Sequence, residues 1–374
     1  LFNPVNITFG NGKRSDFIDK FEKLRLLVVT SERGRQQFSK DSILGTLREN
    51  IIWADKVSAN PGLEETQNQI NLLEGDSFDA VIAFGGGSAI DSAKAFAAAL
   101  TPGSKTNDLK SLITQPKTFL KKGILPIYAI PTTSGTGSEV TPFATIWDHG
   151  KNKKLSLTHP NLFPSYAIVD PELTYKLPYL STISTGLDAL NQAFESIWNK
   201  NRTPISTFFA SKAIFKALYA LPLLHSSLQN HEARLFISEA SLLAGLAISH
   251  TRTAICHSIS YPLTAHYGLQ HGIACAFTMS KVAEEVFQNA PEILDEVARL
   301  NGLKNAKFLL EQLNEVLKII GLKKLIKEKL PNLDLILKLR KEMITPGRSD
   351  NFILPIDNDR LGKILSASML DVEI

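Results

Sequence analysis

The 374-residue sequence has little of several features that mark particular classes of protein. It contains only two cysteines, Cys256 and Cys275, and two thiols in a chain of this length favour reduced core residues over a structural disulfide. No apolar run reaches the roughly 18 to 20 residues of a membrane span, and the first residues lack the pattern of a secretion signal. We therefore expect a cytoplasmic protein with no membrane partner.

An excess of charge of one sign is also missing. The formal net charge is +4, from 41 basic and 37 acidic residues spread along the chain. No block of like charge indicates binding to nucleic acid or to another polyanion. The chain is 44% hydrophobic, which is enough to bury a large core, and its length favours roughly two domains.

Short β-branched runs alternate with amphipathic helical segments through about residue 175. The predicted strands are residues 5–9, 25–30, 51–57, 80–84, 127–130 and 167–169. This alternation predicts an α/β domain over residues 1–175, with a largely parallel sheet and helices on both of its faces. Ligands of such domains bind beyond the carboxyl ends of the strands, so this half is the candidate nucleotide-binding domain.

Residues 176–374 have almost no strand-like runs, and their apolar residues recur at three- and four-residue spacing. This pattern predicts an all-helical second domain. One helix is expected to begin at Thr203-Pro204, a capping threonine with proline in the first helical position, and to run toward Pro222. Residues 303–330 predict one amphipathic helix packed on the core.

Two polar loops each follow a predicted strand of the first domain. Gly85-Gly86-Gly87-Ser88 precedes Asp91 and an alanine-rich helix, and its glycines would let a pyrophosphate approach the helix N-terminus. Residues 131–140 concentrate hydroxyls and glycines that suit a diphosphate, a ribose or a carboxamide. Either loop also suits a purely structural turn. Two such loops on neighbouring strand ends favour a dinucleotide cradle.

A possible metal site lies in the helical half. Asp188 and Gln192 are four residues apart on a predicted helix, so they share one face. His257 precedes Tyr261-Pro262, where we expect the helix to break, and His271 begins the next segment. A carboxylate with two imidazoles suits a divalent transition metal, although histidines near a helix break are often structural or exposed.

These motifs, in this order, resemble the iron-containing (group III) alcohol dehydrogenase family over nearly the whole chain. The matching stretches are Asn60-Pro61, the Gly85 loop with Asp91, residues 131–140, Asp170-Pro171, residues 185–190, and His257 through His271-Gly272. The resemblance implies an α/β dinucleotide-binding domain followed by an all-helical metal-binding domain, the architecture shared with dehydroquinate synthase. It also implies reversible reduction of a small aldehyde, with a metal as Lewis acid and a nicotinamide as hydride donor.

The resemblance assigns roles to residues of the helical half. It makes Asp188, His257 and His271 metal ligands, with Fe²⁺ as the expected ion and Zn²⁺ or Mn²⁺ as alternatives. Gln192 stands where many members have a third histidine, and its neutral oxygen should bind such a metal more weakly. Tyr261 also stands where many members have a histidine. We expect Tyr261 to donate a proton in aldehyde reduction, with water or another group as the alternative.

The expected cofactor is NADPH or NADH. Its predicted contacts are Ser31, Asn60, Gly86, Gly87, Ser88, Asp91, Thr132, Thr133, Thr136, Ser138, Thr145 and Lys154. Ser31 stands where NAD-preferring relatives often carry an acidic residue, so a 2′-phosphate would be tolerated there. Arg33 or Arg35 would then pair with that phosphate, unless both arginines simply face solvent.

Residues 141–148 and 195–201, together with Gln192, resemble the phosphonoacetaldehyde reductase branch, which makes 2-hydroxyethylphosphonate. A doubly charged substrate needs cationic partners, and Arg252, Arg202 and Lys154 are candidates if they are not merely solvated. The alternatives are a general dehydrogenase of short alcohols such as ethanol, butanol or propanediol, and a nucleotide-binding relative that has lost catalysis. A lyase of the same architecture fits the helical motifs less well. The resemblance also implies a homodimer or larger homo-oligomer.

Overall fold

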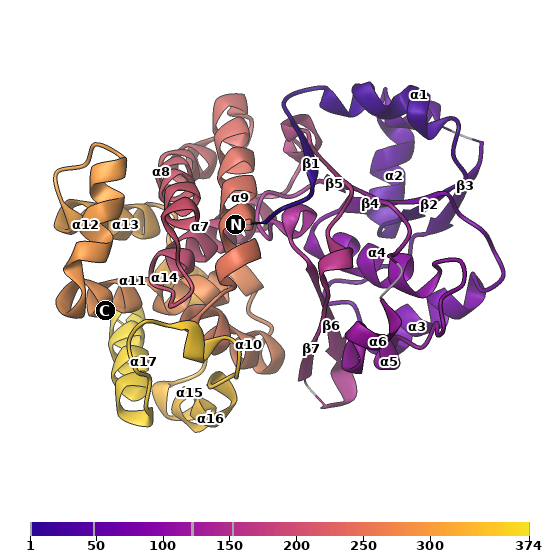
Figure 1. The fold of residues 1–374 in the computed structure, drawn as a ribbon. Helices are drawn as coiled ribbons and strands as arrows, with labels where there is room; N and C mark the ends of the chain where they lie inside the picture. The colour runs from indigo at the N-terminus through magenta and orange to yellow at the C-terminus, as the bar shows by residue number, and fades with distance from the viewer. Residues whose placement is uncertain (1, 48, 121–122, 152, 374) are drawn as a thin grey trace. The chain divides into compact units, whose positions relative to one another are not determined.

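The computed structural model describes residues 2–47, 49–120, 123–151 and 153–373 (Figure 1). Their contacts divide into two compact units. The α/β unit consists of residues 3–133 and 138–174, and the helical unit contains residues 134–137 and the chain from Tyr175 onward. The expected fold class, an α/β part followed by an all-helical part, is confirmed.

A parallel sheet forms the centre of the α/β unit. Among the described residues, six strands pair in the order β1-β8-β5-β4-β2-β3, and every pair is parallel. The strands are β1 (Asn6–Phe9), β2 (Leu26–Val29), β3 (Ile51–Ala54), β4 (Ala80–Gly85), β5 (Ile127–Pro131) and β8 (Tyr166–Val169). All six predicted strands are present. Only β3 is clearly shorter than expected, because residues 55–57 lie outside it.

Helices cover both faces of this sheet, because consecutive strand residues point to opposite sides. Leu27 and Val29 belong to one apolar core with residues of α3, α4 and α5, whereas Leu26 and Val28 belong to another with residues of α1 and α2. Figure 1 shows these helices around the sheet. They are α1 (Ile18–Phe21), α2 (Glu32–Lys40), α3 (Leu63–Leu72), α4 (Gly87–Ala99), α5 (Leu109–Thr114) and α6 (Pro116–Phe119).

An antiparallel hairpin of β6 (Phe143–Asp148) and β7 (Lys153–Thr158) was not predicted. Ala144, Ile146 and Leu157 are fully buried and contribute the hairpin's share of the sheet core. The residues that alternate with Leu157 in β7 are Lys154, Ser156 and Thr158, and the strand begins with two lysines, so the segment looks like a basic turn in the sequence. Burial of one face is what makes it a strand pair.

The helical unit begins with three long helices that pack on one another, α7, α8 and α9. Its helices are α7 (Tyr179–Ile197), α8 (Pro204–Ser226), α9 (His231–Thr251), α10 (Ile255–Tyr267), α11 (His271–Asn289), α12 (Pro291–Leu300), α13 (Ala306–Ile319), α14 (Leu322–Lys327), α15 (Leu333–Lys338), α16 (Arg340–Met343) and α17 (Asn358–Glu373). The start of α8 is confirmed, since the Thr203 hydroxyl accepts a hydrogen bond from the Ser206 amide at 3.2 Å and Pro204 follows it.

Three predicted helix ends are wrong. Helix α8 continues through Pro222, and α10 continues through Pro262 to Tyr267, where Gly268 follows with φ of +63°. A proline removes one backbone hydrogen bond, but both prolines lie among buried apolar neighbours whose packing keeps the helix intact. The single helix predicted over residues 303–330 is two helices, α13 and α14, because Gly321 adopts φ of +69° between them.

The expectation that no apolar segment is long enough to cross a membrane is also wrong for α8. Among the described residues, this helix passes that test by length and composition alone. However, 56% of its apolar window is buried within the protein, where it packs against α7 and α9. Its charged residues have partners, since Lys212 Nζ donates to the Leu300 carbonyl at 2.7 Å and Lys216 pairs with Glu239 at 2.9 Å. These contacts are those of a core helix.

Candidate metal centre

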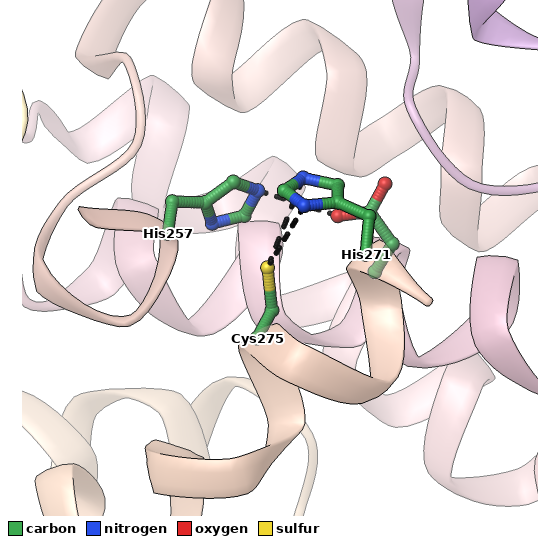
Figure 2. Close-up of side chains that lie close together, drawn as sticks. His257, His271 and Cys275 are labelled. Atoms are coloured by element: carbon green, nitrogen blue, oxygen red, sulfur yellow. Dashed lines mark hydrogen bonds and ion pairs between the residues drawn. The ribbon is translucent and has the colours of Figure 1, made fainter. Parts of the chain in front are cut away.

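Four side chains with metal-binding chemistry come together inside the helical unit. Asp188 of α7, His257 of α10, and His271 and Cys275 of α11 each offer one ligand atom, and these atoms all lie within 4.8 Å of one another. Figure 2 shows the two imidazoles and the thiol converging on one point. The structure thus brings together three predicted ligands and a cysteine that the sequence had not singled out.

Close packing of α11 on α7 places His271 beside Asp188. Gly272 follows His271, and a Cβ atom at this position would overlap the Ser184 carbonyl oxygen and lie 3.0 Å from the Asp188 amide nitrogen. No other residue type fits there without a shift of one helix. Gly272 therefore sets the distance between the helices that carry two of the ligands.

Glu195 fixes the orientation of His257. Its carboxylate lies 2.7 Å from His257 Nδ1, and it accepts hydrogen bonds from the amides of His257 at 3.1 Å and of Ala254 at 2.8 Å. The other ring nitrogen, Nε2, lies 3.3 Å from an Asp188 oxygen. A carboxylate that takes the Nδ1 proton leaves the Nε2 lone pair for a metal. Sequence reasoning missed Glu195, although it lies seven residues after Asp188, on the same helical face.

Cys275 lies against the ring of His271, with its Sγ 3.8 Å from Nε2 and 3.9 Å from Nδ1. The Ser260 hydroxyl lies 3.4 Å from Nδ1 of the same ring. Both cysteines are buried and neither forms a disulfide, as expected. The sequence signal for Cys275 was its place four residues after His271, one turn along the same helix.

The cluster attracts a proton to an imidazole and removes one from a thiol. Burial alone would lower the pKa of His257, but the nearby Cys275, Glu195 and Asp188 outweigh it and raise that pKa well above its usual value. Burial opposes ionisation of Cys275, but His257 and His271 outweigh it and lower the pKa of the thiol to about 7. The two shifts have opposite causes, because the acidic groups stabilise a charged imidazole and the imidazoles stabilise a thiolate.

Gln192 supplies an independent sign of a missing partner. Its side chain is 4% exposed, and its buried Oε1 has no hydrogen-bond donor among the described residues. A buried acceptor without a donor costs about 1–3 kcal/mol, and Gln192 lies one turn from Asp188 on α7. A carboxylate, two imidazoles, a thiol and an amide oxygen on adjoining turns fit a divalent transition metal.

Tyr261 and two arginines lie next to this cluster. The rings of Tyr261 and His271 stack with centroids 6.1 Å apart, and Arg348 Nε donates to Tyr261 Oη at 3.3 Å. Burial, and the charge of Arg348, lower the pKa of Arg252. Both arginines are half-buried. Sequence reasoning missed Arg348, which gives no local signal because it lies 87 residues from Tyr261.

The other arginine predicted at the substrate, Arg202, already has a partner. Its Nη1 lies 3.1 Å from a Glu296 carboxylate oxygen, and about a third of its side chain is exposed. A guanidinium engaged in this way is a weaker candidate for binding an anion than Arg252 is.

In the α/β unit, the predicted glycine loop and the start of the hydroxyl loop lie side by side. Gly86 lies between β4 and α4, and a Cβ atom there would lie 2.9 Å from Thr133 Oγ1. The Thr132 amide donates to the Gly85 carbonyl at 3.0 Å. The backbone of Gly87 and Ser88 forms the first turn of α4, whose amides face outward along the helix axis.

A buried network holds four of the other predicted cofactor residues. Asp91 accepts hydrogen bonds from Ser138 Oγ at 2.5 Å and from the Thr145 amide at 2.8 Å, and the charge of Lys154 acts on it. Lys94, which sequence reasoning missed, donates to the Ser138 carbonyl and hydroxyl at 2.8 and 2.9 Å. The Asp91 carboxylate is thus engaged with the protein, and it ties the hydroxyl loop and the β6–β7 hairpin to α4.

The middle of the hydroxyl loop departs from the expected arrangement, because residues 134–137 belong to the helical unit. Ser134 Oγ and Ser238 Oγ share a hydrogen bond at 2.9 Å. A Cβ atom at Gly135 would lie 2.7 Å from Thr185 Cβ, and one at Gly137 would overlap Gly245. The two glycines permit this close packing, and Thr136 between them belongs to the helical unit.

The remaining candidates lie after β2 and β3. Ser31 caps α2 by accepting a hydrogen bond from the Gly34 amide at 3.1 Å. Arg35 pairs with Asp55 at 2.7 Å and covers the Trp53 ring, whereas Arg33 is exposed. Asn60 has φ of +56°, and its carbonyl lies 3.0 Å from His149 Nε2. Of the two arginines considered for a 2′-phosphate, Arg35 is therefore already engaged.

Comparison with known proteins gives matches over both parts of the chain. Residues 4–171 match the model for iron-containing alcohol dehydrogenase, and residues 182–330 match that for the C-terminal part of the Fe-containing alcohol dehydrogenase family. The NAD-dependent methanol dehydrogenase of Bacillus methanolicus is 33% identical over 320 residues, 82% of each chain.

Two further similarities concern reductases. The phosphonoacetaldehyde reductase of Streptomyces viridochromogenes is 38% identical over 206 residues, which is 54% of this chain and 52% of that one. The crystal structure of sulfoacetaldehyde reductase from Bifidobacterium kashiwanohense in complex with NAD⁺ aligns with a TM-score of 0.85 at 30% identity, over 98% of this chain and 97% of that one.

Proposed function

The chain belongs to the iron-containing alcohol dehydrogenase family, and we propose that this oxidoreductase reduces a small aldehyde to its alcohol, reversibly, with NADH or NADPH. The observation that carries the proposal is the buried cluster of Asp188, His257 and His271, with Glu195 orienting His257. A methanol dehydrogenase named as NAD-dependent and a reductase solved with NAD⁺ are among the similar proteins.

In this proposal Asp188, His257 and His271 hold a divalent metal, and Gln192 faces it from the same side of α7 as Asp188. Fe²⁺ is the ion expected from the family, with Zn²⁺ or Mn²⁺ as alternatives. When bound, the metal and the nicotinamide supply Lewis-acid polarisation of a carbonyl and hydride transfer. Glu195 keeps the Nδ1 proton of His257 on the far side of the ring, so that Nε2 faces the ion.

The glycine loop and the neighbouring threonines are proposed to bind the pyrophosphate. Gly86, Gly87 and Ser88 open α4, and Thr132 and Thr133 lie beside them. Asp91, Ser138, Thr145 and Lys154 would then act mainly by holding this loop and the hairpin in place.

Binding of a 2′-phosphate is the finer part of the cofactor proposal. The absence of an acidic side chain at Ser31 and the exposure of Arg33 support the use of NADPH as well as NADH. Asn60 is proposed to line the same cofactor site.

Tyr261 is proposed as the proton donor in aldehyde reduction. Arginine has donors but no acceptor, so Tyr261 Oη must accept from Arg348 and direct its own hydrogen elsewhere. Its ring stacks on His271, which places the phenol next to the metal cluster. Arg348 would thereby fix the direction of the phenolic proton.

The substrate is proposed to be an aldehyde with an anionic group, best represented by phosphonoacetaldehyde. Arg252 and Arg348 are half-buried and close enough for one charge to lower the pKa of the other, and an anion bound to both would remove this repulsion. Two of the similar proteins are named for aldehydes that carry a phosphonate or a sulfonate. Arg202 is the weaker candidate, because Glu296 already neutralises it.

The test is oxidation of NADPH and NADH, followed at the nicotinamide absorbance, by protein loaded with Fe²⁺ or Zn²⁺. Phosphonoacetaldehyde, sulfoacetaldehyde, propionaldehyde and butyraldehyde are compared. We expect the highest kcat/KM with an anionic aldehyde. Equal or better turnover of the plain aldehydes would keep the dehydrogenase and discard the anionic substrate, leaving a general short-chain alcohol dehydrogenase. No turnover with any substrate or metal would favour a relative without catalysis.

The cellular context is proposed on the resemblance alone. We propose a cytoplasmic enzyme that forms a homodimer or larger homo-oligomer through an edge strand of the sheet. The outer strands are β1 and β3, and β1 leaves Asn6 and Ile7 exposed. An exposed edge strand can pair with a second copy. Analytical ultracentrifugation that finds only monomer would overturn the oligomer.

A further inference from the structure

We propose that Cys275 is a metal ligand in this protein, so that the ion is held by one carboxylate, two imidazoles and one thiolate, and that the site consequently prefers zinc to iron or manganese. The inference rests on the proposed metal-dependent function but concerns the identity of the fourth donor. Binding replaces the thiol proton, which leaves to solvent as the sulfur–metal bond forms.

The separations between the candidate donor atoms support this set. Around a four-coordinate zinc ion, with bonds of about 2.0–2.3 Å, neighbouring ligand atoms lie about 3.3–3.6 Å apart. His257 Nε2 and Asp188 Oδ1 are 3.3 Å apart, and Cys275 Sγ and His271 Nε2 are 3.8 Å apart. These two pairs are therefore within a few tenths of an ångström of the separation that a shared ion requires, and all four donor atoms lie within 4.8 Å of one another.

The fold directs Cys275 to this point. Cys275 lies one turn after His271, and residues four apart on a helix share a face. Gly272, between them, lets that face approach α7 next to Asp188. Cys256, also fully buried, lies next to His257 in the sequence but is not among the clustered donors.

The chemistry of the site gives a reason for a thiolate. Gln192 offers a neutral amide oxygen, a weaker donor to zinc or iron than an anionic sulfur. The two candidates for the fourth position, Gln192 Oε1 and Cys275 Sγ, differ in softness. A thiolate donor shifts preference toward zinc, whereas an amide oxygen leaves the site better suited to harder ions.

Cobalt substitution distinguishes the two donors. Co²⁺ bound to the full-length protein should show a near-ultraviolet sulfur-to-cobalt charge-transfer band. We expect Cys275→Ala and Cys275→Ser to lose this band and to bind Zn²⁺ at least about 100-fold more weakly, the upper end of the effect of outer-shell changes. Cys256→Ser is the matched control and should keep both the band and the affinity, and Gln192→Ala should keep the band.

X-ray absorption of the Zn²⁺-loaded wild type tests the proposal without any variant, so a folding defect cannot obscure it. One sulfur scatterer at about 2.3 Å is the expected result. A shell of nitrogen and oxygen alone, or a cobalt band that persists in Cys275→Ala, would overturn the thiolate ligand and leave the proposed enzyme intact. Failure to bind any of these metals would overturn the metal site itself, and with it the proposed function.

Discussion

Replacement of Glu195 by glutamine tests whether the metal centre depends on the carboxylate behind His257. Glu195 does not itself lie among the clustered donors, and it is fully buried. Its carboxylate receives three N–H groups, His257 Nδ1, the His257 amide and the Ala254 amide. Glutamine keeps an oxygen for His257 Nδ1 but removes the negative charge that makes this imidazole a stronger ligand, so the change should weaken metal binding although no ligand is removed.

The magnitude follows from counting donors. One carboxylate oxygen receives Ala254 N and His257 Nδ1, and the other receives His257 N. The glutamine NH₂ group fits best at the second oxygen, where it meets one backbone N–H and leaves it unsatisfied. A lost hydrogen bond to a buried charged group corresponds to about 1.5–3 kcal/mol of folding stability. The metal affinity should fall about 10- to 100-fold, as for other changes behind a ligating histidine.

The assay is competition for Zn²⁺ against a chromophoric chelator, together with urea unfolding of the metal-free proteins. Glu296→Gln is the matched control, because its ion pair with Arg202 is about one-third exposed and should contribute about 1 kcal/mol or less. Glu195→Asp keeps the charge and covers the case in which the glutamine variant does not fold. Zinc affinity equal to that of the wild type in a folded Glu195→Gln protein would refute the dependence of the metal site on the Glu195 charge.

Three further results are expected. Gly272→Ala should destabilise the protein by about 1–3 kcal/mol and abolish zinc binding, because a Cβ atom there overlaps α7. Gly150→Ala is the control. Its added Cβ atom would lie 3.6 Å from the nearest atom, so stability and zinc affinity should stay unchanged in the same denaturation and binding assays. Arg348→Ala should raise KM for phosphonoacetaldehyde about 10- to 100-fold, because one charge-assisted hydrogen bond is lost, and should leave KM for propionaldehyde unchanged. Equal losses with both aldehydes would show that Arg348 acts only through the proton donor. Arg360→Ala is the control. Stabilisation by Zn²⁺ should increase as pH rises above about 6.5, because the His257 imidazole, whose pKa is raised, and the Cys275 thiol must both lose a proton to bind the ion. Parallel profiles of Tm against pH for the zinc-loaded and metal-free proteins would contradict this.

The sheet was accessible to sequence reasoning because its strands are buried on both faces. Runs such as Leu26–Val29 are continuously apolar, and few other structures use such short runs between helices. The hairpin of β6 and β7 was not accessible, because its lysines mask the alternation and only packing on the sheet core buries its other face. The same holds for Pro262, where tertiary packing outweighs a strong local preference to end the helix.

Sequence reasoning likewise found some residues of the metal cluster and missed others. Spacing placed Asp188 and Gln192 on one face of a helix, His257 and His271 stood out beside an expected helix break, and the family resemblance made Asp188 and the two histidines metal ligands. Neither source indicated Glu195 or Cys275. Both lie one turn from a residue that had been selected, but whether they face the same point depends on how closely α7, α10 and α11 pack. That packing depends on Gly272, whose role becomes visible only when the neighbouring helix is in place.

Gln192 and Tyr261 stand where many relatives have histidines, which suggested a loss of catalysis, but their surroundings argue against that loss. Gln192 removes an imidazole from the expected set, but Cys275 offers an anionic donor within 3.9 Å of His271. Tyr261 replaces another imidazole, and Arg348 fixes the direction of its hydroxyl. Beside them, a fully buried glutamate receives three N–H donors and a glycine permits the close helix packing that brings the ligands together. These compensations favour a working enzyme with a modified metal site over a degenerate relative, and the cobalt spectrum together with the aldehyde comparison separates the two.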